Sequence, residues 1–553
     1  MRTEFPSRQV LARLREKTAH PAGDDLFSAR ILGTDDEPSA SPSNLFRFIV
    51  GDDAQPVAMS VADAEALGDV FSREILLKGQ NPLTLRDLDQ AVAAVNAPAL
   101  PMTRMFLVAE GAQFAAAGKV FELNARLVFT WQESAAKAPD ILLSTVAAAN
   151  DTNSLLQLIS WSDHAGAFQF YERTGGAWVW AGSSFHALMP ASRGKGPFDS
   201  HINGGLVMKE LKAPWTHWHS MSGTISREVF GADSEFNQDP LFAELDGAEQ
   251  LEQIVRTGLR RWTKARIAAD LRQGVLKNLP DYLRQLLWCT SVNLASSRDG
   301  FDSNETEFDL PTSFFYDVDA ISAMARKLDP TADVIPQRPF KVSASSYRAA
   351  VAAAGIAVID VPPAATSIAG DTHFAFLVPE RAFEDLVVVN ELVTQGVLSP
   401  RLALCLLMVD FTNPVFSPAR ALLFRFVPAE VAAGDGGSAL DQRFVAAVRQ
   451  AGPTDAGPEA EFLDLWDRDD LVSHVAELLA AFHGAVEARL QTPDGIADVL
   501  DLAESRRDVV RKLRSLAEFS STLAQGSSPP QHLAMARDGS NFVKPSTGGE
   551  GEL

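Results

Sequence analysis

The sequence predicts an α+β protein in which a central antiparallel β-rich region precedes a mainly helical body. Between residues 119 and 182 the apolar positions alternate with a period of two, which is typical of strands. From residue 239 onward they recur at three- and four-residue spacing, which is typical of amphipathic helices. Because the helical pattern covers the longer part of the chain, we expect helices to outnumber strands.

Composition limits the class of protein. The 553 residues are 46% apolar and 22% charged, as in a globular chain that buries one large core or several smaller ones. The formal net charge of −22 repels nucleic-acid phosphate and anionic lipid headgroups, so we expect neither a nucleic acid nor a membrane as partner. The longest uncharged apolar stretch, residues 349–359, is about half of the ~20 residues that a membrane span needs.

The chain has two cysteines, Cys289 and Cys405, and each lies in an apolar helical context. Their number and context exclude a disulfide framework, a cysteine-based zinc site and an iron–sulfur cluster. We therefore expect a reducing, cytoplasmic environment.

Five regions follow from the composition along the chain. The termini are rich in Gly, Ser and Pro, which predicts a flexible arm at one end and a disordered tail at the other. The regions are a flexible arm over 1–43, an N-terminal helical region over 44–118, the β-rich region over 119–235, the helical body over 236–525 and the disordered tail over 526–553.

Individual helices are predicted from apolar spacing and from the residues that precede it. Residues 61–71 and 84–95 carry helical patterns behind Ser60 and Thr84, whose hydroxyls suit the N-cap position. Two further apolar stripes predict packing helices in the body. They comprise Leu251, Ile254, Val255, Leu259 and Trp262, and Val475, Leu478, Leu479, Phe482, Val486 and Leu490.

A β-hairpin is predicted over residues 167–182, where two strand-like runs flank Gly175 and Gly176. A two-residue turn there places Arg173 opposite Trp178 and Tyr171 opposite Trp180, so these four side chains share one face. An arginine among aromatic rings permits cation–π contact. The alternative is that this face is ordinary sheet core.

Histidine and tryptophan are concentrated in one short segment. Five of the ten histidines and five of the nine tryptophans fall between residues 161 and 219, which makes this segment the default site candidate. They are His164, His186, His201, His217 and His219, with Trp161, Trp178, Trp180, Trp215 and Trp218.

Residues 193–205 within this segment have the composition of a binding loop. Arg193 and Lys195 would attract the anionic group of a substrate, and the loop glycines would let the backbone approach a ligand. Asp199 lies two residues before His201, a spacing that can orient an imidazole for general-base catalysis. The alternative is an ordinary surface loop with turn glycines.

His217 and His219 form a His-x-His pair near Pro214, which favours extended backbone and places both imidazoles on one side. Such a pair can hold a metal ion together with a third ligand from elsewhere in the chain. The candidates for that third ligand are His201, Asp199, Glu210, His186, Asp371 and His373. His373 lies two residues after Asp371, the same spacing as between Asp199 and His201, and is a second candidate acid–base residue. The alternative is that the histidines bond to backbone groups.

The function expected from these features is an intracellular enzyme acting on an anionic small molecule. Catalysis would involve His201, Asp199 and His373, and Trp178, Trp180, Trp215 and Trp218 would form apolar walls. A cofactor would be one transition-metal ion or a non-covalent haem held by histidine, for an oxidoreductase or hydrolase reaction. The alternative is a non-catalytic assembly or ligand-binding protein, including a homo-oligomer, that uses the Trp-rich hairpin as an interface.

Overall fold

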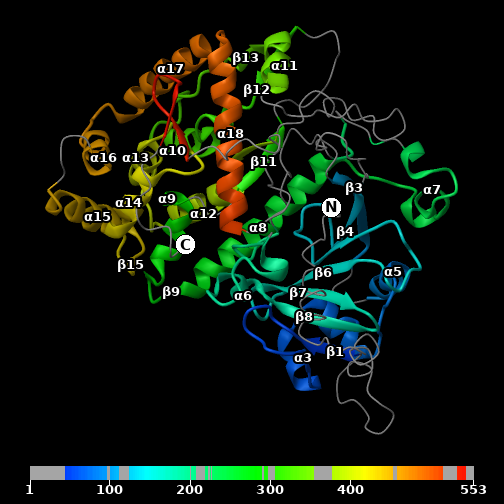
Figure 1. The fold of residues 1–553 in the computed structure, drawn as a ribbon. Coiled ribbons are helices and arrows are strands. Elements are labelled where there is room, and N and C mark those ends of the chain that lie inside the picture. Colours follow the sequence, from blue (N-terminus) through cyan, green and yellow to red (C-terminus); the bar gives the residue numbers. More distant parts are fainter. Residues whose placement is uncertain are drawn as a thin grey trace.

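The fold is α+β, with 48% helix and 17% strand, as the sequence predicts (Figure 1). The computed structural model describes residues 44–95, 100–110, 124–199, 201–206, 218–221, 225, 227–288, 292–296, 306–353, 377–452, 457–514 and 532–543. The expected N-terminal arm lies outside these residues.

One large sheet forms the first half of the molecule. Its strands are β1 (Leu45–Arg47), β2 (Val57–Ala58), β3 (Met102–Glu110), β4 (Asn124–Gln132), β5 (Ile141–Thr145), β6 (Leu156–Ser162), β7 (Ala167–Thr174) and β8 (Ala177–Ser183). The spatial order is β2-β1-β8-β7-β6-β5-β4-β3, and every neighbouring pair is antiparallel except β1 and β8. Because β1 and β3 belong to it, the sheet extends across the boundary expected at residue 118.

The predicted hairpin is confirmed. β7 pairs with β8 with Tyr171 opposite Trp180 and Arg173 opposite Trp178, and Gly175 takes a φ of 58° in the turn. Trp178 is fully buried and its Nε1 donates to the carbonyl of Pro82 at 2.9 Å. This face of the hairpin is therefore sheet core.

The predicted N-caps of the early helices are also confirmed. Ser60 caps α3 (Val61–Leu67) and Thr84 caps α5 (Leu85–Ala93), each in a capping box with an aspartate three residues later. The helix expected over 61–71 is instead two, because Gly68 adopts the left-handed conformation and Asp69 caps a new helix, α4 (Val70–Glu74).

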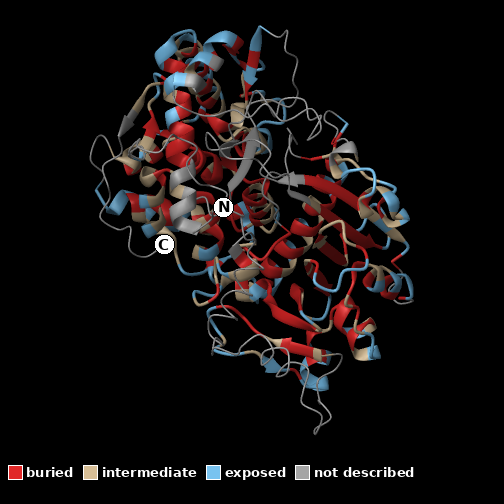
Figure 2. Cartoon of the chain, turned by 45° about the vertical axis from the view of Figure 1, so that its right-hand side comes forward, coloured by how far each residue is buried: buried red, intermediate tan, exposed pale blue. Residues whose placement is uncertain are grey.

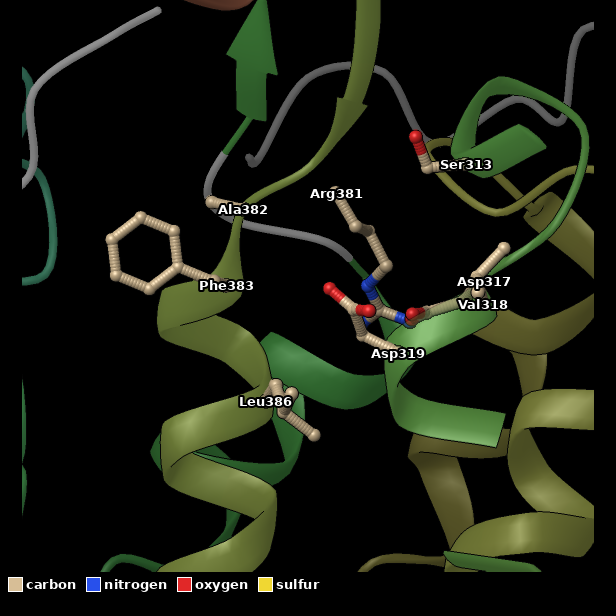
Figure 3. Close-up of a pocket in the computed structure, with 8 residues that line it drawn as sticks. All are labelled: Ser313, Asp317, Val318, Asp319, Arg381, Ala382, Phe383 and Leu386. Atoms are coloured by element: carbon tan, nitrogen blue, oxygen red, sulfur yellow. The ribbon is translucent and has the colours of Figure 1, made fainter. Parts of the chain in front are cut away.

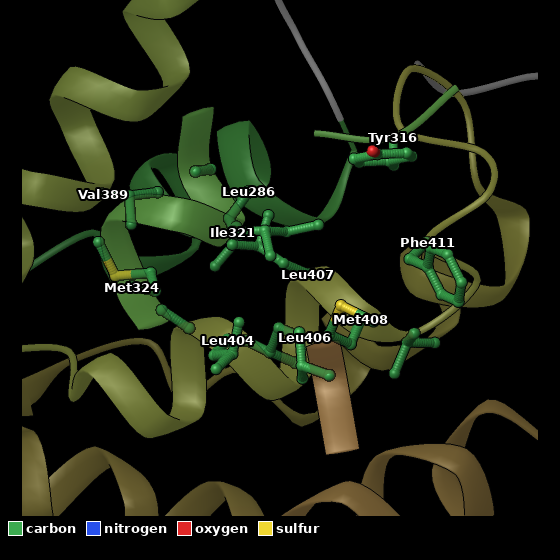
Figure 4. Close-up of a cluster of buried hydrophobic side chains, with 14 of the residues drawn as sticks. Leu286, Tyr316, Ile321, Met324, Val389, Leu404, Leu406, Leu407, Met408 and Phe411 are labelled. Carbon is green, nitrogen blue, oxygen red and sulfur yellow. The ribbon is translucent and has the colours of Figure 1, made fainter. Parts of the chain in front are cut away.

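Helices dominate the second half, as expected. Its helices of nine residues or more are α8 (Ala248–Asp270), α9 (Leu279–Leu287), α10 (Val318–Leu328), α11 (Ala344–Ala353), α12 (Phe383–Thr394), α13 (Pro400–Met408), α15 (Ser438–Gln450), α16 (Pro458–Trp466), α17 (Leu471–Leu490) and α18 (Pro493–Arg514). Figure 4 shows part of their shared core, to which α9 contributes Leu286, α10 contributes Met324 and α13 contributes Leu407.

The prediction of a disordered tail is wrong for residues 532–543. They form a hairpin of β16 (Leu533–Met535) and β17 (Asn541–Val543). Met535 is buried, and its backbone bonds to Asn413 and Thr412, with Met535 N donating to Asn413 Oδ1 at 2.9 Å. A short strand with few apolar residues is stable here because distant side chains satisfy its polar groups.

Buried apolar side chains form two large clusters that meet at α8. The sheet cluster comprises residues between Leu45 and Trp262 together with Phe383 of α12, and the helical cluster begins at Ile267. Figure 1 shows α8 between the sheet and the helical body, and Figure 2 shows buried segments filling the interior of both halves. No helix in the described part of the chain is long and apolar enough to cross a membrane.

Candidate functional site

The segment that holds Arg193 follows α6 (Ser184–Leu188) and leads into a short helix, η3 (Gly196–Asp199). Arg193 is held by this segment, because its backbone N–H donates to the carbonyl of Met189 and its Nη2 to that of Leu188, both at 2.8 Å. Lys195 is exposed, and its Nζ donates to the carbonyl of Ala191 at 2.6 Å. The two predicted anion-binding residues therefore have different surroundings.

Two of the loop glycines, Gly204 and Gly205, are required for packing, which corrects for these two the expectation that they admit a ligand, whereas Gly194 has open space beside it. A Cβ on Gly205 would lie 2.3 Å from Leu259 Cδ2 of α8, and one on Gly204 would lie 2.5 Å from the carbonyl oxygen of Ser184. Trp262 Nε1 of α8 donates to the carbonyl of Asn203 at 2.7 Å in the same loop. The glycines thus bring the backbone against α6 and α8.

His201 lies against the sheet. Its Nδ1 is 2.8 Å from the carbonyl oxygen of Gly205 and its ring centroid is 5.4 Å from that of Phe170 in β7. The backbone of Asp199 lies in η3, but its side chain is outside the description, and His373 lies outside the described residues. The acid–base roles of these three residues stay predictions.

The structure does not bring His201 and His219 together. The backbone N–H of His219 donates to Leu107 of β3 at 3.0 Å, and β3 is four strands from β7 in the sheet order. At the usual strand spacing this separation is about 19 Å. His217 and Trp215 lie outside the described residues, and among those described no three His, Cys, Asp or Glu side chains form a grouping that could hold a metal ion.

The described tryptophans of the predicted site are core residues. Trp178, Trp180 and Trp218 are all buried in the sheet cluster, and Trp180 Nε1 donates to Gln169 Oε1 at 2.9 Å. They are therefore packed by the protein itself instead of presenting an aromatic patch to a partner. The proposed use of the hairpin as an interface lacks the exposed rings that it requires.

Arg193 belongs to a group of three arginines that we call the arginine cluster: Arg193, Arg266 of α8 and Arg284 of α9. Burial and the neighbouring positive charge of Arg284 lower the pKa of the Arg193 guanidinium, and Arg266 adds to this effect while Asp281 opposes it. Arginine remains protonated at neutral pH, so Arg193 lies within electrostatic range of two further positive charges.

The members of the arginine cluster are not neutralised by ion pairs. In the described part of the chain none of the three forms one with a carboxylate, although the protein carries an excess of acidic residues. Arg266 is only 4% exposed; its Nη2 donates to Gln285 Oε1 at 2.9 Å, whereas its buried Nε has no hydrogen-bond partner. The buried Nε of Arg284 has none either.

Aromatic rings support the arginine cluster. The guanidinium of Arg266 lies 4.4 Å from the ring centroid of Tyr282 and 5.9 Å from that of Trp262. The guanidinium of Arg284 lies 5.0 Å from the ring of Trp288. Ring faces orient a guanidinium through cation–π attraction without supplying the negative charge of a carboxylate.

The sequence contains a signal for Arg266. The apolar stripe through Leu259 and Trp262 continues with helical spacing to position 266, where an arginine takes the place of an apolar residue. A cation on the buried face of an amphipathic helix is unusual enough to mark a site. Arg284 has no comparable signal, because its approach to Arg193 depends on the fold.

A chain of buried polar groups leads from Arg266 into the helical half. Gln285, which accepts from Arg266, donates through Nε2 to Asp385 Oδ1 at 3.3 Å. Asp385 pairs with Arg381 Nε at 3.4 Å, and Arg381 Nη1 lies 3.4 Å from Asp317 Oδ2. Burial raises the pKa of Asp385 to about 7, against the opposing charge of Arg381.

A small pocket lies at the far end of this chain (Figure 3). Figure 3 shows Arg381 extending from β14 (Leu377–Arg381) toward the first turn of α10, where Asp319 lies, while Phe383 and Leu386 of α12 form the other wall. Asp317 and Asp385 already pair with Arg381, so the cation in this pocket is neutralised by the protein. This distinguishes the pocket from the arginine cluster.

Comparison with protein-family models, curated proteins and solved structures finds no match to this chain.

Proposed function

We propose that the protein binds an anionic small molecule at the arginine cluster, where phosphate or carboxylate oxygens accept hydrogen bonds from Arg193, Arg266 and Arg284. Two observations carry this proposal. Arg193 lies within electrostatic range of Arg266 and Arg284, and among the described residues none of the three forms an ion pair with a carboxylate, although Arg266 is buried with its Nε unpaired. Planar guanidinium groups bind carboxylate and phosphate through paired N–H donors.

Electrostatics favours an occupied site over an empty one. Removing a charged side chain from water costs several kcal/mol unless an opposite charge compensates it, and neighbouring like charges add to this cost. In this protein Arg266 is buried beside Arg193 and Arg284. An anion that bridges the three side chains supplies the missing compensation, so binding should stabilise the fold.

This proposal keeps the anionic ligand of the enzyme hypothesis and moves its binding site. The predicted site centred on His201 and the tryptophans, whereas the arginine cluster takes only Arg193 from the predicted residues. The other two cations come from α8 and α9. Whether a reaction follows binding is the part of the enzyme hypothesis that stays a prediction.

The test is the thermal unfolding midpoint of the full-length protein in inorganic phosphate and in sodium chloride of equal ionic strength. A ligand at ten times its Kd stabilises the native state by about 1.4 kcal/mol, so phosphate should raise the midpoint more than chloride does. Arg193→Gln removes one charged donor and should weaken phosphate binding about ten-fold. We expect its phosphate-dependent shift to be correspondingly smaller.

A matched variant is needed because phosphate also stabilises proteins through exclusion from their surfaces. Arg260 is exposed on α8, outside the arginine cluster. Arg260→Gln carries the same change of charge and should retain the phosphate-dependent shift of the wild type. Equal shifts in Arg193→Gln and Arg260→Gln would refute specific binding at the arginine cluster.

A further inference from the structure

Two large apolar side chains are exposed beside the arginine cluster. Phe185 of α6 is 39% exposed and Met189, at the C-cap of the same helix, is 41% exposed. We call these two side chains the apolar step. They lie four residues apart on one turn of chain, so their side chains are neighbours at a separation of about 5–6 Å.

Contacts tie the apolar step to the arginine cluster. The ring of Phe185 packs edge-to-face on Trp262, with centroids 5.1 Å apart, and the guanidinium of Arg266 lies 5.9 Å from the same Trp262 ring. Met189 is also adjacent, because its carbonyl accepts from the backbone N–H of Arg193 at 2.8 Å. A molecule bound to the three guanidinium groups would thus have exposed apolar surface next to it.

Resting on the proposed function, we infer that the ligand is a compact anion with one aromatic ring, an aryl phosphate or an aryl carboxylate. Its anionic group binds the arginine cluster and its ring covers Phe185 and Met189. Aromatic rings pack favourably against a phenylalanine ring and against methionine sulfur. The apolar step spans about the width of one ring, which favours a ring over a long acyl chain.

Charge and apolar surface together distinguish this site from ordinary surface features. Single exposed apolar residues are common on proteins and need no explanation. Here two of the seven exposed large apolar side chains in the described part of the chain lie on one turn, next to a cationic cluster without ion pairs. An amphipathic anion can contact both the arginine cluster and the apolar step, whereas inorganic phosphate can contact only the arginine cluster.

The test compares dissociation constants of the full-length protein for matched probes by titration calorimetry. Phenyl phosphate and methyl phosphate carry the same anionic group, and benzoate and acetate form the corresponding carboxylate pair. Covering the apolar step should make the aryl member of at least one pair bind about ten-fold more tightly. The pair that shows the larger difference identifies the phosphate or the carboxylate as the anionic group.

Variants of the apolar step show whether this difference in affinity arises there. Met189→Ala should weaken binding of the aryl probe several-fold and leave that of its small partner unchanged, and Phe185→Ala should do the same. Because Phe185 also packs on Trp262, Met189→Ala is the variant less prone to disturb the fold. Met221→Ala is the matched control, since Met221 is 94% exposed and its backbone N–H donates to Glu249 in the first turn of α8, at the opposite end of that helix from Arg266.

The outcomes separate this inference from the proposed function. Equal affinities for the aryl and small probes, or equal losses for both in Met189→Ala, would overturn the aromatic ligand and leave anion binding intact. If wild-type protein binds none of the four probes, both proposals fail. Both proposals are supported if the wild type binds the aryl probe more tightly than its small partner, if Met189→Ala reduces this preference, and if Met221→Ala leaves it unchanged.

Discussion

The hairpin β7–β8 and the junction of α6, α8 and α9 each bury an arginine near aromatic rings, but they satisfy its charge differently. In the hairpin, Arg173 is 5% exposed and its terminal nitrogens donate to the carbonyls of Thr152, Ser154 and Gly175. In the junction, Arg266 donates to Gln285 and forms no ion pair with a carboxylate among the described residues. Where the chain itself supplies hydrogen-bond acceptors for a buried cation, that cation is part of the scaffold. Where the chain does not supply them, the cation marks a ligand site.

The largest effect should come from the hairpin core. Trp178→Ala removes a fully buried ring that packs on Phe71 and donates to Pro82, so we expect the free energy of unfolding to fall by about 3–5 kcal/mol. Urea unfolding measures it. Unchanged stability together with weaker ligand binding would show that Trp178 lines a site, as first predicted from the sequence.

The two arginines should respond differently to the same substitution. Arg173→Met leaves carbonyl oxygens of Thr152 and Ser154 without their donor, and we expect a loss of about 3 kcal/mol in the free energy of unfolding. Arg266→Met also removes a buried cation, but it relieves repulsion within the arginine cluster. Its stability without ligand should change by less than about 1 kcal/mol.

Chemical denaturation of both variants in chloride buffer measures this contrast. A much lower free energy of unfolding for Arg173→Met than for Arg266→Met would support the difference between the two arginines. Comparable losses in both variants would mean that Arg266 is held by the scaffold as firmly as Arg173, and the arginine cluster would then need no anion.

A smaller effect concerns Glu172, the carboxylate next to Arg173. Burial raises the pKa of Glu172 to about 8, and the charge of Arg173 only partly opposes this shift. The folded protein therefore retains a proton that the unfolded chain loses from about pH 4.3 upward. The free energy of unfolding should fall as the pH rises from there to about 8 and then level off.

Glu172→Gln should remove this part of the pH dependence. Relative to the wild type, the variant should gain on the order of 2 kcal/mol between about pH 5 and about pH 8.5. Urea unfolding at both pH values provides the measurement. Glu65→Gln, at an exposed position, is the control and should follow the wild type. Parallel pH dependence in the wild type and Glu172→Gln would contradict a protonated Glu172.

Local signals in the sequence predict the local parts of the fold. Ser60 and Thr84 cap their helices, and the hairpin register follows from Gly175, because each depends on residues a few positions apart. Gly68 shows the limit of such signals: the apolar pattern continues through it, yet its left-handed backbone ends one helix before Asp69 caps the next.

Long-range contacts account for what the sequence does not predict. His201 and His219 are near in sequence, but they contact β7 and β3, which are four positions apart in the sheet order. Conversely, Arg193 and Arg284 approach each other although 91 residues separate them. The clustering of histidine and tryptophan identified a segment that reaches the candidate site, but composition does not specify which of its side chains does so.

Locating a bound anion in a crystal would show directly whether the arginine cluster is an anion-binding site. Crystals of the full-length protein soaked in sodium selenate would give an anomalous difference map that shows selenium positions. We expect a selenium peak within hydrogen-bond distance of the guanidinium groups of Arg193, Arg266 and Arg284. Selenate bound elsewhere on the protein, with no peak at the arginine cluster, would contradict it.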